Sequence, residues 1–130
     1  MLYSRRVQFY ETDAQGIVHH SNYFRYFEEA RGELLRERGL PYSEVRKLGY
    51  EVVLLEAVCN FKKPIFYDEV IDIELEVGEV DRFRFSFSYK VYVKGGLRAT
   101  GSTKHCMVKE GKLVSLPEEV KDKLLIGVER

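Results

Sequence analysis

The sequence of 130 residues has no tryptophan, only two cysteines and three prolines, and no excess of charge of either sign. Twenty-one basic residues balance twenty-one acidic ones. Nucleic-acid-binding proteins usually carry a basic excess, so we expect no nucleic-acid partner. Hydrophobic residues make up 45% and charged residues 32%, which is typical of a globular protein. The length fits one domain over residues 1–130.

Long hydrophobic runs are also missing. No stretch approaches the ~20 apolar residues that a membrane-spanning helix requires, so we expect no stable membrane association. Arg5 and Arg6 are typical of a twin-arginine export signal, but the polar residues Glu11, Thr12 and Asp13 follow where such a signal has an apolar stretch. We therefore expect a cytoplasmic protein.

Cys59 and Cys106 form no Cys-x-x-Cys motif, and disulfides are rare in a reducing compartment. We interpret both as small buried thiols. The sequence therefore predicts neither a disulfide nor a cysteine metal site.

One segment has the spacing of an amphipathic helix. Its apolar residues recur at helical intervals, and charged residues occupy the opposite side; the apolar set is Tyr23, Phe27, Ala30 and Leu34. Ser21 and Asn22 are predicted as helix N-caps, and Gly39 as a left-handed residue after the last turn. These signals predict about four or five helical turns. A shorter helix is predicted over 41–48, ending at Gly49.

Most of the remaining chain alternates apolar and polar residues, as strands do. The predicted strands cover residues 5–10, 50–61, 71–77, 83–93 and 99–107. Gly95-Gly96 and Glu110-Gly111 are predicted tight turns, and Pro117 is predicted to open a short helix ending near Leu125. A single long helix needs a large apolar partner, which the inner face of the sheet provides. The pattern predicts an α+β chain in which about five antiparallel strands pack on one long helix.

Such a sheet leaves an edge strand with unpaired backbone groups. Pairing two copies across a two-fold axis would satisfy these groups. Tyr10, Tyr67 and Tyr92, which are predicted to lie on outer faces, could also contact a partner.

The segment from Val7 to Arg31 combines groups that could act on a carbonyl. Asp13 lies in a predicted loop over 13–20, where Gly16 permits a tight turn. The free N–H groups of the following helix point toward that loop, and such groups bind anions and polarise carbonyls. A carboxylate beside them could attack a carbonyl and stabilise the oxyanion. A plainer interpretation is also open, because an aspartate before a helix often only satisfies a turn.

His19 and His20 also suggest a metal site, or a Ser–His–Asp triad with Ser21. Adjacent histidines on a loop rarely point at one ion, and His105 is distant in the sequence. Ser21 is better explained as a helix cap. Neither interpretation is favoured.

Residues 12–31 resemble the active-site signature of the 4-hydroxybenzoyl-CoA thioesterase family. The matching residues are Thr12, Asp13, Gly16, Val18, His20, Asn22, Tyr23, Glu29, Ala30 and Arg31. The similarity continues from Ala57 through Pro64 to Asp68, and from Ala99 to Thr103. Within the family, the chain is similar to the small bacterial acyl-CoA thioesterases associated with the Tol-Pal gene cluster, which carry histidine at the position of His20.

The resemblance implies a hotdog fold, an antiparallel sheet wrapped around one long central helix, and hydrolysis of acyl-CoA to a free acid and CoA without metal or cofactor. It implies that Asp13 is the nucleophile or the general base, and that the backbone N–H at His20 polarises the thioester carbonyl, with its imidazole as a further aid. Members of this branch often have tyrosine where this chain has Phe9. Tyr10 would face the other side of the strand, which puts help from a phenol in doubt.

Several residues are predicted to bind the substrate. The acyl group is expected against Tyr23, Phe27 and Phe61, although core packing explains them equally well. The CoA phosphates are expected near basic residues, which could also be ordinary surface charges: Lys62, Lys63 and Arg82, with Arg84 and Lys104 as further candidates. The expected partners are acyl-CoA or an acyl-carrier-protein thioester, and a second copy in a homodimer assembled into a homotetramer. Two other functions stay open, a non-catalytic acyl-CoA-binding module and a hotdog hydratase or dehydratase.

Overall fold

The structure, a computed structural model, describes residues 1–127. Its elements follow in the order β1 (Leu2–Arg6), the 3-10 turn η1 (Phe9–Glu11), α1 (Ser21–Glu37), α2 (Tyr42–Lys47), β2 (Tyr50–Phe61), β3 (Val70–Val80), β4 (Arg84–Val93), β5 (Gly96–Lys109), β6 (Lys112–Val114) and α3 (Glu118–Leu124). In this part of the chain no helix is both long and apolar enough to cross a membrane.

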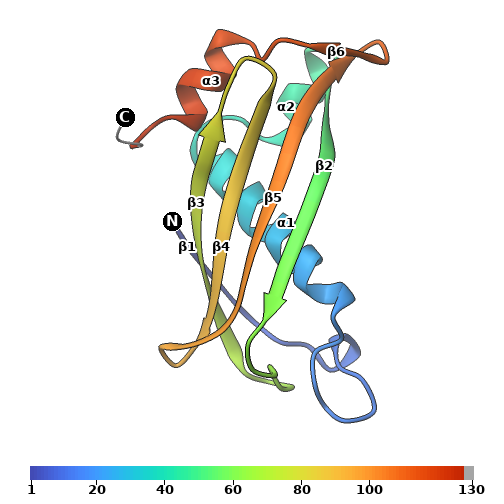
Figure 1. The fold of residues 1–130 in the computed structure, drawn as a ribbon, viewed down its shortest axis with the longest axis vertical. Coiled ribbons are helices and arrows are strands. Elements are labelled where there is room, and N and C mark those ends of the chain that lie inside the picture. Colours follow the sequence, from blue (N-terminus) through green and yellow to red (C-terminus); the bar gives the residue numbers. More distant parts are fainter. Residues whose placement is uncertain (128–130) are drawn as a thin grey trace.

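The strands form one antiparallel sheet in the order β1-β3-β4-β5-β2, with β6 paired to β5. Helix α1 lies diagonally along one face of this sheet, and β2 is the strand at one edge (Figure 1). An antiparallel sheet curved around one long helix is the hotdog arrangement. The predicted fold and the predicted long helix are therefore confirmed.

The core forms where the apolar stripe of α1 meets the alternating residues of the central strands. Tyr26, Phe27 and Ala30 of α1 are completely buried, as the periodicity predicts. The ring of Phe27 stacks on Tyr89 of β4 at a centroid distance of 4.2 Å. This stacked pair fixes the middle of the helix above the middle of the sheet.

Gly101 of β5 allows the close approach of α1. A Cβ atom at this position would lie 2.4 Å from Cε2 of Phe27 and 2.9 Å from the carbonyl oxygen of Val58. Real Cβ atoms do not make such short contacts. The distance between the helix and the sheet therefore depends on residue 101 being glycine, which has no side chain.

Three local predictions are wrong. The first strand is Leu2–Arg6 rather than 5–10, because the Glu11 carboxylate accepts the Gln8 N–H at 2.8 Å and turns the chain at η1. Helix α1 has no side-chain N-cap; the Ser21 hydroxyl is 2.8 Å from the His19 ring, and the Asn22 amide donates to the Glu11 carbonyl. The β4–β5 hairpin turns at residues 94–95, which both have positive φ, and not at the predicted Gly95-Gly96.

The other boundaries agree with the sequence. Gly39, Gly49 and Gly111 have the positive φ values expected of turn residues. Cys59 and Cys106 are free thiols, half-buried and buried respectively, and burial raises the pKa of Cys59 to about 11.

Gly101→Ala is expected to lower the free energy of unfolding by about 2 kcal/mol, because the added methyl group overpacks the contact with Phe27. Gly96→Ala is the matched control on the same strand, since its nearest neighbour is the Val93 carbonyl oxygen at 3.5 Å. Urea unfolding of both variants measures the difference. Equal midpoints would show that α1 can move away from the sheet without cost.

His105 predicts a pH dependence of stability. Its ring is 1% exposed, and burial, followed by the charge of Arg31, lowers its pKa from 6.5 to about 4. The unfolded chain therefore binds a proton more readily than the folded chain between these values. The free energy of unfolding should fall as the pH drops from about 6.5 to about 4, by at most ~3 kcal/mol.

Unfolding of the wild type and of His105→Gln across this pH range tests the effect. Glutamine keeps a group that can hydrogen-bond to Thr103, which lies 2.9 Å from His105 Nε2. The variant should lose the part of the pH dependence due to His105. If both proteins have the same slope, His105 is not the group responsible.

Candidate active site

The loop that carries Asp13 is a small, fixed hairpin. Thr12 pairs with Val18, and Ile17 pairs with Phe66. The Asp13 N–H donates to the Ile17 carbonyl at 2.8 Å, and Gly16 turns the chain with a φ of +77°. The predicted turn at Gly16 is therefore confirmed, and the loop is tied to the chain on both sides.

The Asp13 carboxylate is exposed, and the loop engages one of its two oxygens. Oδ1 accepts the N–H of Gln15 at 2.8 Å and that of Ile17 at 3.4 Å. No donor in residues 1–127 hydrogen-bonds to Oδ2. Asp13 thus satisfies a turn, as the plainer interpretation has it, while Oδ2 makes no hydrogen bond within the described residues.

The start of α1 supplies a free hydrogen-bond donor. The N–H groups of Asn22 and Tyr23 donate back to His19 and His20 at 3.0 and 3.2 Å. The N–H of His20 has no acceptor among the residues that the structure describes. This donor stands at the positive end of the helix macrodipole, where an oxyanion is stabilised.

The main-chain carbonyl of Glu11 joins the loop to the helix. It accepts the His19 N–H at 2.9 Å and the Asn22 amide at 2.8 Å. Asp13 follows Glu11 by two residues, and His20 lies between its two partners. The segments that carry the carboxylate and the free donor are therefore joined through one carbonyl oxygen.

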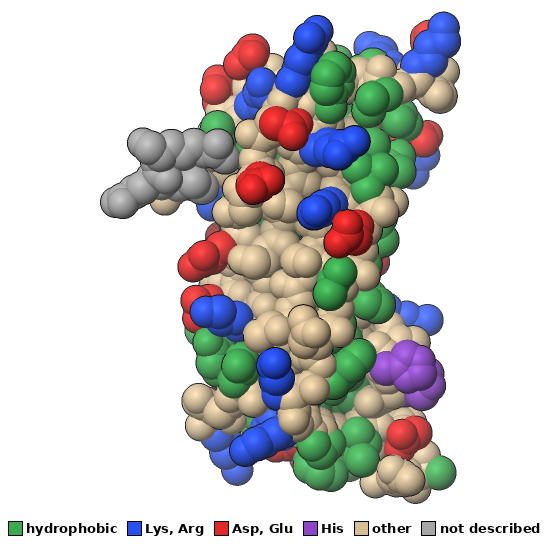
Figure 2. Space-filling view, in the orientation of Figure 1, with side chains coloured by type: hydrophobic (Ala, Val, Ile, Leu, Met, Phe, Trp, Pro, Cys, Tyr) green, Lys and Arg blue, Asp and Glu red, His purple; other side chains and the backbone are tan. Residues whose placement is uncertain are grey.

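A pocket of about 280 Å³ opens beside this helix end. It is lined by Ile17, Val18, His20, Tyr23, Phe61, Lys62, Lys63 and Pro64. The rings of Tyr23 and Phe61 meet edge to face at 4.8 Å. Figure 2 shows exposed histidine side chains at this edge of the molecule, with hydrophobic side chains beside them. Five of the predicted site residues therefore line one pocket: His20, Tyr23, Phe61, Lys62 and Lys63. Asp13 and Gly16 are not part of its lining.

Two further predicted binding residues, Phe27 and Arg82, lie farther from the pocket. Phe27 is 0% exposed, stacked within the core. Arg82 precedes β4 and lies 3.3 Å from the Ser115 hydroxyl, at the end of the sheet opposite the Asp13 loop (Figure 1). The structure brings neither to the pocket. Tyr10 is 77% exposed in η1 and does not line the pocket.

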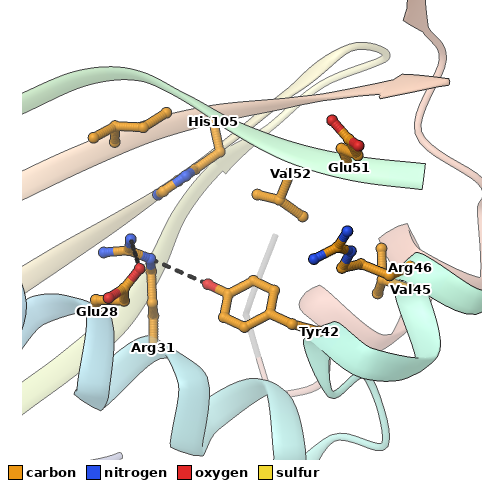
Figure 3. A pocket seen from close by; sticks show the side chains of 9 residues that line it. Glu28, Arg31, Tyr42, Val45, Arg46, Glu51, Val52 and His105 are labelled. Carbon is orange, nitrogen blue, oxygen red and sulfur yellow. Dashed lines mark hydrogen bonds and ion pairs between the residues drawn. The ribbon is translucent and has the colours of Figure 1, made fainter. Parts of the chain in front are cut away.

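A second pocket, of about 460 Å³, was not predicted. It lies between α1, α2, β2 and β5, and its lining is Glu28, Arg31, Tyr42, Val45, Arg46, Glu51, Val52, Leu54 and His105 (Figure 3). Arg31 is only 8% exposed. A signal was present in the sequence, because Arg31 falls on the apolar stripe of the helix, four residues after Phe27.

The two other chemistries suggested by the histidines lack support in geometry. No group of three His, Cys, Asp or Glu side chains within residues 1–127 is placed to hold a metal ion. The His19 Nδ1 and Ser21 Oγ atoms are 2.8 Å apart, but no carboxylate in the same residues hydrogen-bonds to His19.

Known proteins resemble the chain over most of its length. The family model of the thioesterase-like superfamily matches residues 7–124. The crystal structure of a hypothetical protein from Aquifex aeolicus superposes with a TM-score of 0.93 at 62% identity, covering 95% of this chain and 98% of the other.

Two relatives have named activities. An acyl-CoA thioesterase, YbgC, of Haemophilus influenzae is 30% identical over 121 residues, 89% of this chain and 88% of the relative. A 1,4-dihydroxy-2-naphthoyl-CoA hydrolase of Thermosynechococcus vestitus is 31% identical over 105 residues, 79% of this chain and 72% of the relative.

Proposed function

The chain belongs to the thioesterase-like superfamily, and from this and the geometry of the Asp13 loop we propose that it is an acyl-CoA thioesterase. It hydrolyses the thioester bond to a free acid and CoA. The observation that carries the proposal is the presence, in adjoining segments, of a carboxylate oxygen without a hydrogen-bond partner, Oδ2 of Asp13, and of a free backbone donor, the N–H of His20. The Glu11 carbonyl, two residues before Asp13, accepts from His19 and Asn22, the residues on either side of this donor and its neighbour Ser21.

The reaction follows from these two groups. The thioester carbonyl oxygen binds the His20 N–H, which stabilises the negative charge that develops there; one such donor is worth about 3 kcal/mol in the barrier. Asp13 then acts on the carbonyl carbon in one of two ways. Its Oδ2 attacks directly, CoA leaves as a thiol after protonation, and water hydrolyses the mixed anhydride. Alternatively, Asp13 removes a proton from the water that attacks.

The pocket beside the helix suits the two parts of the substrate. Lys62 and Lys63 offer positive charges for the CoA phosphates, and both are exposed. Tyr23 and Phe61 offer an apolar wall near the thioester. An acyl-carrier-protein thioester would present the same phosphopantetheine arm. The Tol-Pal-associated branch of the 4-hydroxybenzoyl-CoA thioesterase family is the proposed branch, because its members carry histidine at the position of His20.

We further propose that the protein is a homodimer formed through β2. This strand of 12 residues pairs on one side with β5, and its other edge carries no partner strand in the described chain. Four apolar side chains of the strand are between 39% and 54% exposed: Leu54, Leu55, Val58 and Phe61. Long apolar edges pair readily with another copy. Tyr10 and Tyr67, at 77% and 51% exposure, are candidates for a second contact that makes a homotetramer.

Asp13→Asn is expected to lower the rate of CoA release by at least ~10²-fold, because it keeps the shape of the side chain but removes its charge. The measurement is thiol release from aliphatic and aromatic acyl-CoA esters. Asp122→Asn, an exposed aspartate on α3, is the matched control. Ser21→Ala tests the serine–histidine alternative and should remain active.

Other outcomes favour other functions. A wild type that binds the esters but releases no thiol is an acyl-CoA-binding module. One that changes the acyl group without releasing thiol is a hydratase or dehydratase.

Light scattering tests the dimer. Leu55→Lys combined with Val58→Lys should convert the assembly to single chains or weaken it, because like charges then face each other across the two-fold axis. Leu97→Lys combined with Leu113→Lys is the matched control on β5 and β6, where both leucines are also exposed. A wild type with the mass of one chain would overturn this proposal.

A further inference from the structure

The unpredicted pocket contains a buried positive charge with little neutralisation. The Arg31 guanidinium donates from Nε to the Tyr42 hydroxyl at 3.2 Å, and its Nη2 lies 3.8 Å from the Glu28 carboxylate. The second distance is too long for a hydrogen bond. The Glu28 side chain is also 68% exposed, so water weakens the attraction. A buried cation with so weak a partner is costly for the folded chain.

The fork of the same guanidinium is available to a ligand. Neither Nη atom of Arg31 makes a hydrogen bond within residues 1–127. Tyr89, a neutral neighbour of the guanidinium, shares a hydrogen bond of 2.7 Å with Thr103 and adds no negative charge to the pocket. Figure 3 shows the Arg31 side chain directed from α1 into the space between Tyr42 and His105. A planar fork of this kind binds a carboxylate through two parallel hydrogen bonds.

Other groups of the pocket add donors rather than negative charge. Tyr42 accepts from Arg31, so its own hydroxyl proton is free to donate. Arg46 extends from α2 into the same pocket, and no carboxylate of the described residues lies within 4 Å of it. His105 contributes no charge near neutral pH, because burial and Arg31 lower its pKa to about 4.

The rest of the lining limits the kind of anion. Val45, Val52 and Leu54 form apolar walls. Glu28 and Glu51 are exposed at the rim and would repel a multiply charged anion such as inorganic phosphate. The lining therefore fits a ligand with one negative charge and an apolar body.

We propose that the Arg31 pocket binds the carboxylate of an organic acid. The carboxylate pairs with the Arg31 fork and accepts the Tyr42 hydroxyl, while the apolar body lies against the walls. This carboxylate belongs either to a free organic acid or to the far end of the acyl group of an acyl-CoA substrate. The second source rests on the proposed function.

The position of Arg31 on α1 makes the second source possible. Arg31 follows His20 by eleven residues, which is three helical turns and roughly 16 Å along the axis. Residues at this interval lie on the same side of a helix. An extended acyl chain that starts at the His20 N–H could therefore reach the Arg31 pocket along one side of α1.

The first experiment titrates the protein with hexanoate and with hexanamide by calorimetry. The two probes have nearly the same shape and differ in charge. Hexanoate should bind at least ~10-fold more tightly, and Arg31→Gln should remove the difference. Arg36→Gln, an exposed arginine on the same helix, should leave it unchanged. Inorganic phosphate should not displace hexanoate.

The second experiment compares thiol release from dodecanedioyl-CoA and dodecanoyl-CoA. A higher kcat/KM for the dicarboxylic ester, lost in Arg31→Gln, assigns the site to the far end of the substrate. Equal values, with hexanoate binding lost in the same variant, assign it to a free acid.

The proposal is overturned if hexanoate and hexanamide bind equally and the two esters react equally. If no ester releases thiol, the proposed function fails, but the hexanoate titration still decides what the pocket binds. If Arg31→Gln does not fold, Arg31→Lys replaces it, since lysine keeps the charge without the fork. The comparison of hexanoate with hexanamide on the wild type then still decides.

Discussion

The candidate active site depends on one buried carboxylate, that of Glu11. It is 4% exposed and lies 2.6 Å from Arg5, while also accepting the Gln8 N–H at 2.8 Å. Arg5 contacts α1 as well, through Glu29 at 2.9 Å and over the ring of Tyr26 at 4.6 Å. Removing one partner of such a buried pair typically costs about 3–5 kcal/mol. The first strand, the 3-10 turn and the helix are therefore held together by side chains of opposite charge.

This attachment explains why an exposed loop can be a precise site. Asp13 has few contacts of its own beyond its loop, but the chain on either side of it is fixed. Glu11 sits two residues before it, and Val18 donates its N–H to Ile65 at 2.8 Å after it. The main-chain carbonyl of Glu11 then holds the start of α1. Catalysis by positioning requires such a frame, because errors of about 1 Å between reacting groups reduce rates strongly. The free His20 N–H costs little in stability, because His20 is an exposed residue.

Hydrophobic periodicity was sufficient to predict the helix, the strands and the packing of one on the other. Tyr23, Phe27, Ala30 and Leu34 share a side of α1 because 3.6 residues make a turn, whatever the rest of the chain does. Periodicity did not predict the turn at η1, since the Glu11 side chain decides it by binding Arg5 and Gln8. Capping preferences likewise failed at Asn22, whose amide is taken by a carbonyl eleven residues earlier.

The residues of the two candidate sites also fall into those that the sequence could predict and those that it could not. Asp13, Gly16 and His20 are close in sequence, so the sequence motif alone was enough to predict that they belong to one site. Lys62 and Lys63 reach the pocket beside His20 through the pairing of β2 with the sheet, and only the resemblance pointed to them. The Arg31 pocket was missed because its lining comes from α1, α2, β2 and β5, whose arrangement no local pattern contains.

Two positions on the same side of α1, the N–H at its start and the Arg31 pocket three turns later, differ in the kind of group that would bind a ligand. At the start of α1 the donor proposed to act on the thioester is a backbone N–H, which is independent of the side chain at that position. Three turns later the pocket is defined by side chains, above all Arg31 and Tyr42. A substitution at the second end can change what is bound without altering the donor at the first. Both ends nevertheless depend on the contact between them, where Phe27 rests on Gly101 and Tyr89. Because that contact sets the height of the whole helix above the sheet, a side chain at position 101 would move the donor and the pocket together.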